Sequence, residues 1–248
     1  MRKYLTSFIV LSLCMCANLA SAAVVNHDIS TRSLTISASS TDEYVITGST
    51  TSNYVVVEFG WKGTITLKNC YFDFSYQSNS PIRITGKNNL SNSDPSRTNV
   101  NLILEGDNYI YNEGGGCACI QVDQGAQINI SAIEPCDNSS GTLTALQASA
   151  DGGAAIGSLN RYRCSGTPNE TLSSALISTT GSTEYTAGGN VVISSGTIKT
   201  MGGHGAGIGG GYGGNIDVYY DGMIVIYGGV VEAAATWHAA GIGSGCPT

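Results

Sequence analysis

The sequence predicts an all-β protein, a right-handed single-stranded parallel β-helix (β-solenoid) with three short strands per coil. Glycine supplies 33 of the 248 residues, and most of it falls after position 114 in recurring phrases. Two of these phrases place their isoleucines, Ile208 and Ile242, 34 residues apart, a spacing typical of solenoids and propellers. Between the glycines, β-branched residues alternate with threonine, serine and asparagine, which favours strands.

Each predicted repeat contains three phrases that read as short strands. The Gly-Ile-Gly phrase occurs at 153–157, 205–209 and 239–243, and it is preceded by a second phrase at 141–145, 196–200 and 229–233. A third phrase, at 191–193 and 223–226, precedes two of these. Glycine disfavours helices at about 1 kcal/mol per position, and a propeller would need four strands and recurring aromatic marks per blade.

One continuous core should collect the apolar residue of each phrase in stacked ladders. The interval between the first two Gly-Ile-Gly copies is longer because a loop from Leu159 to Gly181 is inserted there. The residues expected in the ladders are Ile156, Ile193, Ile198, Ile208, Ile226, Val231 and Ile242.

The N-terminal half shows the same pattern of short alternating strands, but less regularly. Short alternating strands are expected at 64–67, 100–104, 120–122 and 126–130, and a polar loop at Asn88–Thr98. We therefore divide the chain into irregular β-rich coils at 23–115 and regular glycine-rich coils at 116–248, within one continuous solenoid.

Residues 1–22 have the pattern of a secretory signal peptide. Arg2 and Lys3 precede an apolar run from Tyr4 to Cys16, and small residues end the segment before Ala23. This run is shorter than the roughly 20 apolar residues of a membrane-spanning helix, so we expect no transmembrane segment. The predicted location is secreted, extracellular or on the cell surface.

The net charge of the chain limits which kinds of partner are expected. Cleavage would remove two basic residues and no acidic one, which moves the formal net charge from −7 to −9. Nucleic acid is therefore excluded as an expected partner. Only 12% of the residues are charged, and a neutral surface covered by serine, threonine and asparagine suits polysaccharide or protein contacts.

Six cysteines remain after the predicted cleavage, and an even number in an exported chain indicates up to three disulfides among 15 possible pairings. A metal site is the weaker alternative, since no second Cys-x-Cys or histidine pair lies near the first. The candidates are Cys70, Cys117, Cys119, Cys136, Cys164 and Cys246.

The phrases at 141–145, 204–211 and 226–233 resemble those of a family of exported bacterial carbohydrate-binding parallel β-helix proteins. The resemblance covers residues 100–248 and implies the fold. The typifying members of that family bind acidic plant polysaccharides of the polygalacturonate type and carry calcium. Similar glycine-rich repeats occur in surface adhesins, and no set of calcium ligands can be matched residue by residue.

Catalysis is not the expected function. Gly203-His204-Gly205 resembles the histidine motif of polygalacturonases, but the aspartates and the Arg-x-Lys segment that accompany it there are missing. No pair of acidic residues recurs at a fixed repeat position, as a glycoside hydrolase would need. His204 and His238 each stand four residues before an isoleucine and should stack on adjacent coils.

The candidate ligand site lies on the C-terminal coils. Aromatic rings on a flat solenoid face can stack on sugar CH groups, while neighbouring polar groups bond the hydroxyls. The candidate contacts are Tyr220, Tyr227 and Trp237, with Asp217 and Asp221 as polar or calcium-bridging groups. Calcium is a candidate cofactor, because an acidic protein and an acidic glycan repel one another without a cation.

The sequence thus favours a secreted or cell-surface carbohydrate-binding or adhesive β-solenoid whose partner is a polysaccharide or surface glycan. Two alternatives stay open. One is a pectinase-like polysaccharide lyase or hydrolase, and the other is a purely structural surface repeat protein.

Overall fold

The computed structural model describes residues 22–87, 94–150, 152–159, 188–212 and 222–246. In this part of the chain the protein is all-β apart from one short 3-10 helix, η1 (Asn138–Ser140). No helix in it is both long and apolar enough to cross a membrane. The strands are β1 (Val24–Asp28), β2 (Leu34–Ile36), β3 (Glu43–Thr50), β4 (Val55–Val57), β5 (Lys62–Phe74), β6 (Ile82–Ile84), β7 (Thr98–Asn112), β8 (Ile120–Val122), β9 (Ala126–Ala132), β10 (Gly141–Gln147), β11 (Ile156–Gly157), β12 (Asn190–Ile193), β13 (Thr197–Gly202), β14 (Ile208–Gly209), β15 (Ile224–Ile226), β16 (Val230–Ala235) and β17 (Ile242–Gly243).

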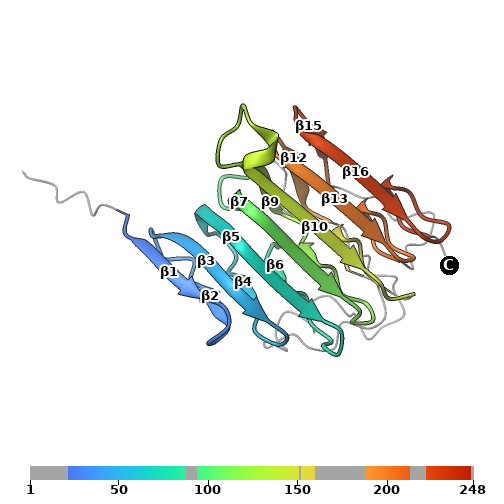
Figure 1. The fold of residues 1–248 in the computed structure, drawn as a ribbon, viewed down its shortest axis with the longest axis horizontal. Coiled ribbons are helices and arrows are strands. Elements are labelled where there is room, and N and C mark those ends of the chain that lie inside the picture. The colour runs from blue at the N-terminus through green and yellow to red at the C-terminus, as the bar shows by residue number, and fades with distance from the viewer. Residues whose placement is uncertain (1–21, 88–93, 151, 160–187, 213–221, 247–248) are drawn as a thin grey trace, which may run out of the picture.

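These strands form two parallel sheets that extend along the long axis of the molecule (Figure 1). The 10-stranded sheet has the order β1-β3-β5-β7-β10-β13-β16, with β9, β12 and β15 paired alongside, and the 7-stranded sheet has the order β17-β14-β11-β8-β6-β4-β2. Strand β7 pairs through residues 98–104 with β9 and through residues 106–112 with β10. The all-β, parallel architecture is compatible with the predicted β-solenoid.

The predicted isoleucine ladders are confirmed by the strand register. Ile156 is the partner of Ile208, and Ile208 is the partner of Ile242. Ile193 likewise pairs with Ile226, and Ile198 with Val231. Each ladder is fully buried except at its last step, where Ile226 is 43% and Ile242 45% exposed and Val231 is half-buried. Among the described residues, β15, β16 and β17 have a paired neighbour on one side only.

Glycine is required beside the stacked isoleucines. Gly157 and Gly209 have φ values of 140° and 133°, in the region that disfavours side chains. A Cβ at Gly157 would lie 2.1 Å from the carbonyl oxygen of Gly209, and one at Gly209 would lie 2.0 Å from that of Gly243. The repeated Gly-Ile-Gly phrase thus combines an apolar core position with close approach between neighbouring backbones.

The strands expected in the N-terminal half lie within β5, β7, β8 and β9. Strands β1 to β4 were not predicted, and they precede the first predicted strand in the chain. The core here contains large rings, since Trp61, Phe72 and Phe74 are fully buried. The expected polar loop ends at Thr98, the first residue of β7, but residues 88–93 and 160–187 lie outside the described part of the chain.

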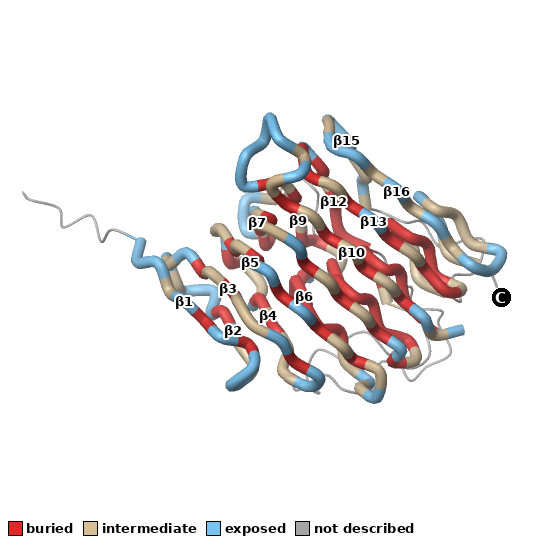
Figure 2. The backbone as a smooth tube through the Cα atoms, viewed as in Figure 1, coloured by how far each residue is buried: buried red, intermediate tan, exposed pale blue. Residues whose placement is uncertain are grey.

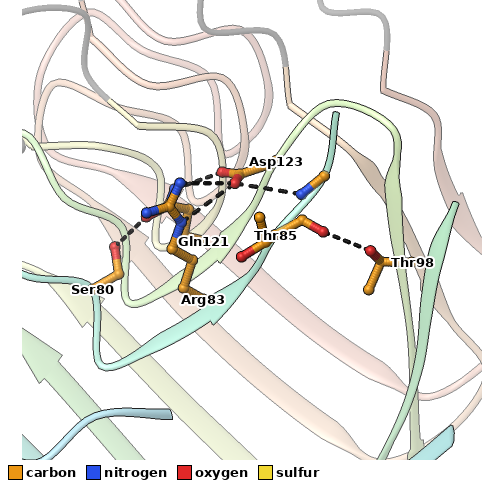
Figure 3. Close-up of polar contacts among 7 residues, drawn as sticks. Ser80, Arg83, Thr85, Thr98, Gln121 and Asp123 are labelled. Atoms are coloured by element: carbon orange, nitrogen blue, oxygen red, sulfur yellow. Dashed lines mark hydrogen bonds and ion pairs between the residues drawn. The ribbon is translucent and has the colours of Figure 1, made fainter. Parts of the chain in front are cut away.

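A buried polar network holds the middle of the 7-stranded sheet together (Figure 3). Arg83 of β6 lies beside Gln121 of β8 in register, and its Nη2 is 3.1 Å from Oδ2 of Asp123. Gln121 donates to the other oxygen of Asp123 and accepts from the Ser80 hydroxyl at 3.0 Å. Because the charges are paired and hydrogen-bonded, the network leaves no uncompensated charge buried in the sheet.

Of the six candidate cysteines, Cys70, Cys119 and Cys136 are thiols. The predicted pairing is therefore not found at these three. Cys117 is disulfide-bonded, and Cys164 lies outside the described residues.

Candidate functional site

The structure describes only part of the ligand site predicted at the C-terminal coils. Asp217, Tyr220 and Asp221 lie outside the described residues. Tyr227 and Trp237 are 78% and 57% exposed, but β16, a strand of 6 residues, lies between them in the chain. Such a strand is about 20 Å long. The structure therefore places these two rings at opposite ends of β16 rather than in one site.

Trp237 packs against a histidine. The ring centroids of His204 and Trp237 are 5.2 Å apart with perpendicular planes, and Tyr212 lies 4.7 Å from the same imidazole. These are the ring contacts that the structure shows for His204, whereas the sequence predicted stacking on His238. Nδ1 of His204 is buried and has no hydrogen-bond partner among the described residues, so no described carboxylate orients this imidazole through Nδ1 as the aspartate of a Ser-His-Asp triad does.

Three exposed carboxyl groups have pKa values below their ordinary range. Hydrogen bonds from the serine two residues further along lower the pKa of Asp28, Asp94 and Asp137. A general acid for glycoside hydrolysis needs a raised pKa instead. These three carboxylates therefore act as turn-forming acceptors. Within the described residues, no group of three or more His, Cys, Asp or Glu side chains is placed to hold a metal ion.

A different aromatic surface lies on the outer side of the 10-stranded sheet. Tyr71 of β5 and Tyr109 of β7 are register partners, and their rings stack with centroids 5.1 Å apart and an interplanar angle of 10°. Tyr71 is 45% exposed, while the next residues along each strand, Phe72 and Ile110, are fully buried. Alternate residues of a strand face opposite sides, so both tyrosines point outwards.

Polar and charged groups continue this surface along the same strands. Asp73 and Tyr111 are register partners, and the Tyr111 hydroxyl donates to Oε2 of Glu113 at 3.5 Å. Burial raises the pKa of Tyr109, and the nearby charges of Tyr71 and Asp73 raise it further. Burial and then Glu113 raise the pKa of Tyr111. Both phenols therefore stay protonated at neutral pH and keep an O–H donor.

An open hollow of about 340 Å³ adjoins Tyr71. Ser49, which also lines it, is the register partner of Tyr71 on β3, so the hollow lies on the side of the ring away from Tyr109. Its remaining walls are residues 50–53, Ser30 and Asp73. The hollow thus combines one aromatic ring, one carboxylate and several hydroxyl groups, and we call it the Tyr71 hollow.

Two bulges precede the residues that border the Tyr71 hollow. The register between β3 and β5 shifts between Thr47 and Ser49 and, on the partner strand, between Lys68 and Tyr71. Gly48 and Asn69 have φ values of 96° and 51° in these bulges. Glycine and asparagine tolerate this left-handed conformation, and bulges re-aim the side chains that follow them.

Hydrogen bonds fix the wall of the Tyr71 hollow. Asn53 donates its side-chain amide to the Ile29 carbonyl at 2.9 Å, and its backbone amide donates to the Thr50 hydroxyl at 2.8 Å. The backbone amide of Ser52 donates to the same hydroxyl at 3.2 Å. A wall held in this way loses little conformational freedom when a ligand binds.

This surface was not predicted from the sequence, because it lies outside the glycine-rich repeats on which the predicted site was based. A signal was available, since residues 70–74 read Cys-Tyr-Phe-Asp-Phe and residues 108–112 read Asn-Tyr-Ile-Tyr-Asn. In both segments an outward tyrosine precedes a buried apolar residue. Recognising that these segments lie side by side needs the strand register, which no glycine phrase marks.

No family model, curated protein or solved structure matches this chain. The function is therefore inferred from the geometry of the chain itself.

Proposed function

We propose that the chain is a secreted or cell-surface carbohydrate-binding or adhesive protein, built as a right-handed parallel β-helix with three strands per coil. The register supports this coil. In the C-terminal part, β12 pairs with β15, β13 with β16 and β14 with β17. Three consecutive strands thus find partners in the next three strands of the chain, as in a repeating three-strand coil.

The observation that carries the binding function is the stacked, outward-facing pair of Tyr71 and Tyr109 beside the Tyr71 hollow. One face of the Tyr71 ring is covered by Tyr109. The other face borders the hollow, where it can pack against the CH groups of a pyranose. The surrounding hydroxyl and carboxylate groups offer both donors and acceptors to sugar hydroxyls.

Export is consistent with this function. The charged and apolar segment before Ala23 has the pattern of a secretory signal peptide, and glycans of cell surfaces and matrices are encountered outside the cell. The large parallel sheet also offers a flat, extended surface, which suits a polymer ligand.

Binding to a glycan array, compared between the wild-type chain and Tyr71→Ala, tests the proposal. We expect the wild type to bind at least one glycan and Tyr71→Ala to lose about tenfold or more in affinity, since a stacked ring contributes about 1.4 kcal/mol. Tyr227→Ala is the matched control, because it removes an exposed tyrosine from the C-terminal coil, and it should bind as the wild type does.

Other outcomes of the same experiment would contradict the proposal. Binding that survives Tyr71→Ala but is lost in Tyr227→Ala would move the site to the C-terminal coils. Release of new reducing ends or unsaturated uronates from a bound glycan would indicate a polysaccharide hydrolase or lyase. Absence of binding to every glycan, with and without calcium, would favour a purely structural repeat protein.

A further inference from the structure

Asp73 gives the Tyr71 hollow a negative charge. Glu113, directly after β7, lies beside Tyr111 on the other side of β5. Two lysines of the same sheet are ion-paired, Lys68 with Glu105 at 2.6 Å and Lys199 with Glu232 at 3.4 Å, and Lys62 donates to the Pro95 carbonyl. In the described part of the structure, no basic side chain lines the hollow.

The tyrosines respond to this negative field. After burial and Tyr71, the charge of Asp73 contributes to the raised pKa of Tyr109. After burial, Glu113, Tyr109 and Asp73 contribute in turn to the raised pKa of Tyr111. The carboxylates thus act on the same aromatic surface that a sugar would contact.

We propose that the Tyr71 hollow binds an uncharged pyranose unit of a neutral glycan and discriminates against uronates, an inference that rests on the proposed function. Asp73 is the side chain that distinguishes a neutral sugar from a uronate. A carboxylate only accepts hydrogen bonds, and a sugar hydroxyl can donate one to it. Such a charge-assisted bond is about twice as strong as a neutral one. A uronate would instead bring a second negative charge against Asp73, and like charges in a site are unfavourable.

The position of Asp73 is fixed before the ligand binds. Its Oδ1 accepts hydrogen bonds from both the backbone amide and the hydroxyl of Ser75, the former at 3.3 Å. The bonds that the structure shows for this carboxylate go to Oδ1, so Oδ2 can accept from a sugar. A carboxylate oriented in this way provides specificity at little entropic cost.

The experiment compares neutral oligosaccharides of glucose, galactose, mannose and xylose with oligogalacturonate of equal length, by calorimetric titration of the full chain. We expect a neutral oligosaccharide to bind with an affinity that changes less than about twofold between low and high salt, since no ionic contact is screened. Oligogalacturonate should bind at least about tenfold more weakly at low salt.

Asp73→Asn isolates the carboxylate. We expect it to weaken binding of the neutral oligosaccharide about tenfold and to strengthen binding of oligogalacturonate. Glu134→Gln removes an exposed negative charge remote from the hollow and should change neither affinity by more than about twofold. A melting temperature within the wild-type range will show that both variants are folded.

The results separate this inference from the proposed function. Tyr71-dependent binding that prefers oligogalacturonate to every neutral oligosaccharide would overturn the neutral-glycan inference while carbohydrate binding stands. Unchanged neutral binding in Asp73→Asn would overturn the role of Asp73. Failure of every oligosaccharide to bind would remove both the inference and the function on which it rests.

Discussion

The inward-facing isoleucines at the two ends of the 7-stranded sheet are buried to very different extents (Figure 2). At the N-terminal end, Ile36 of β2 is fully buried although β2 pairs only with β4. At the C-terminal end, Ile242 of β17 is 45% exposed. The most regular coil in the sequence is therefore the least protected coil in the structure. Regular repetition places the isoleucines of successive coils in register. The isoleucine of the last coil is buried only where other groups cover it.

At the N-terminal end, hydrogen bonds hold the turn that follows β1. Asp28 accepts a hydrogen bond from the Ser30 amide at 2.9 Å, and the Thr31 hydroxyl donates to the Asp28 carbonyl at 2.8 Å. His27 is buried, and its Nε2 donates to the Arg32 carbonyl at 2.9 Å. These hydrogen bonds hold the turn that contains Ile29, which is fully buried in the same core cluster as Ile36.

The largest expected effect is a difference in stability between Ile36→Ala and Ile242→Ala. Ile36→Ala should lower the free energy of unfolding by about 2–5 kcal/mol, because it leaves a cavity in a closed core. Ile242→Ala should cost less than about 1 kcal/mol, since its side chain is already half in water. Urea denaturation of both variants measures this. Equal losses would show that the C-terminal end is covered as well as the N-terminal one.

A smaller effect separates two glycines that have the same backbone conformation. Gly209 and Gly243 have φ values of 133° and 132°, so alanine strains both by about 1 kcal/mol or more. At Gly209 the new Cβ would also meet the Gly243 carbonyl oxygen at 2.0 Å, whereas at Gly243 the nearest atom is the Ala240 Cβ at 3.5 Å.

We therefore expect Gly209→Ala to cost about 2 kcal/mol more than Gly243→Ala in thermal or urea unfolding. The comparison is internally controlled, because both variants make the same change in the unfolded chain. Similar costs would mean that conformational strain dominates and that the backbones of β14 and β17 separate easily.

The sequence was sufficient for the strands and their ladders in the glycine-rich half. Ile156, Ile208 and Ile242 recur in the same phrase, so their register follows from alignment of the repeats. Burial of the last step did not follow, because a sequence pattern marks the inward direction of a side chain and not what covers it.

The candidate site was not predictable in the same way. Tyr71 and Tyr109 are 38 residues apart, in a region without glycine phrases, and a register shift separates the two tyrosines from the alternating pairs before them. The residue count between two strands does not give the number of bulges. The contact between these rings therefore required the three-dimensional structure.

The smallest expected effect concerns thiol reactivity and contrasts the closed core with an exposed turn. Burial raises the pKa of the Cys70 thiol to about 12, whereas Cys136 is exposed. Only the thiolate reacts with iodoacetamide, so Cys136 should be alkylated readily at pH 8. At that pH the folded protein holds on the order of 10⁻⁴ of Cys70 as thiolate. Cys70 should therefore react only when the protein unfolds.

The same raised pKa predicts the direction of alkaline destabilisation. The Cys70 thiol of the unfolded chain has an ordinary pKa of about 9.0, and burial raises the pKa in the folded chain to about 12. Between these values the unfolded state binds fewer protons, so the stability present below pH 9 is lost as the pH rises towards 12. Cys70→Ala, compared with Cys136→Ala, should reduce this loss of unfolding free energy with rising pH.

Rapid alkylation of Cys70 in folded protein at pH 8, located by mass spectrometry, would contradict the reactivity prediction and show that the closed core opens frequently near the bulge at Asn69.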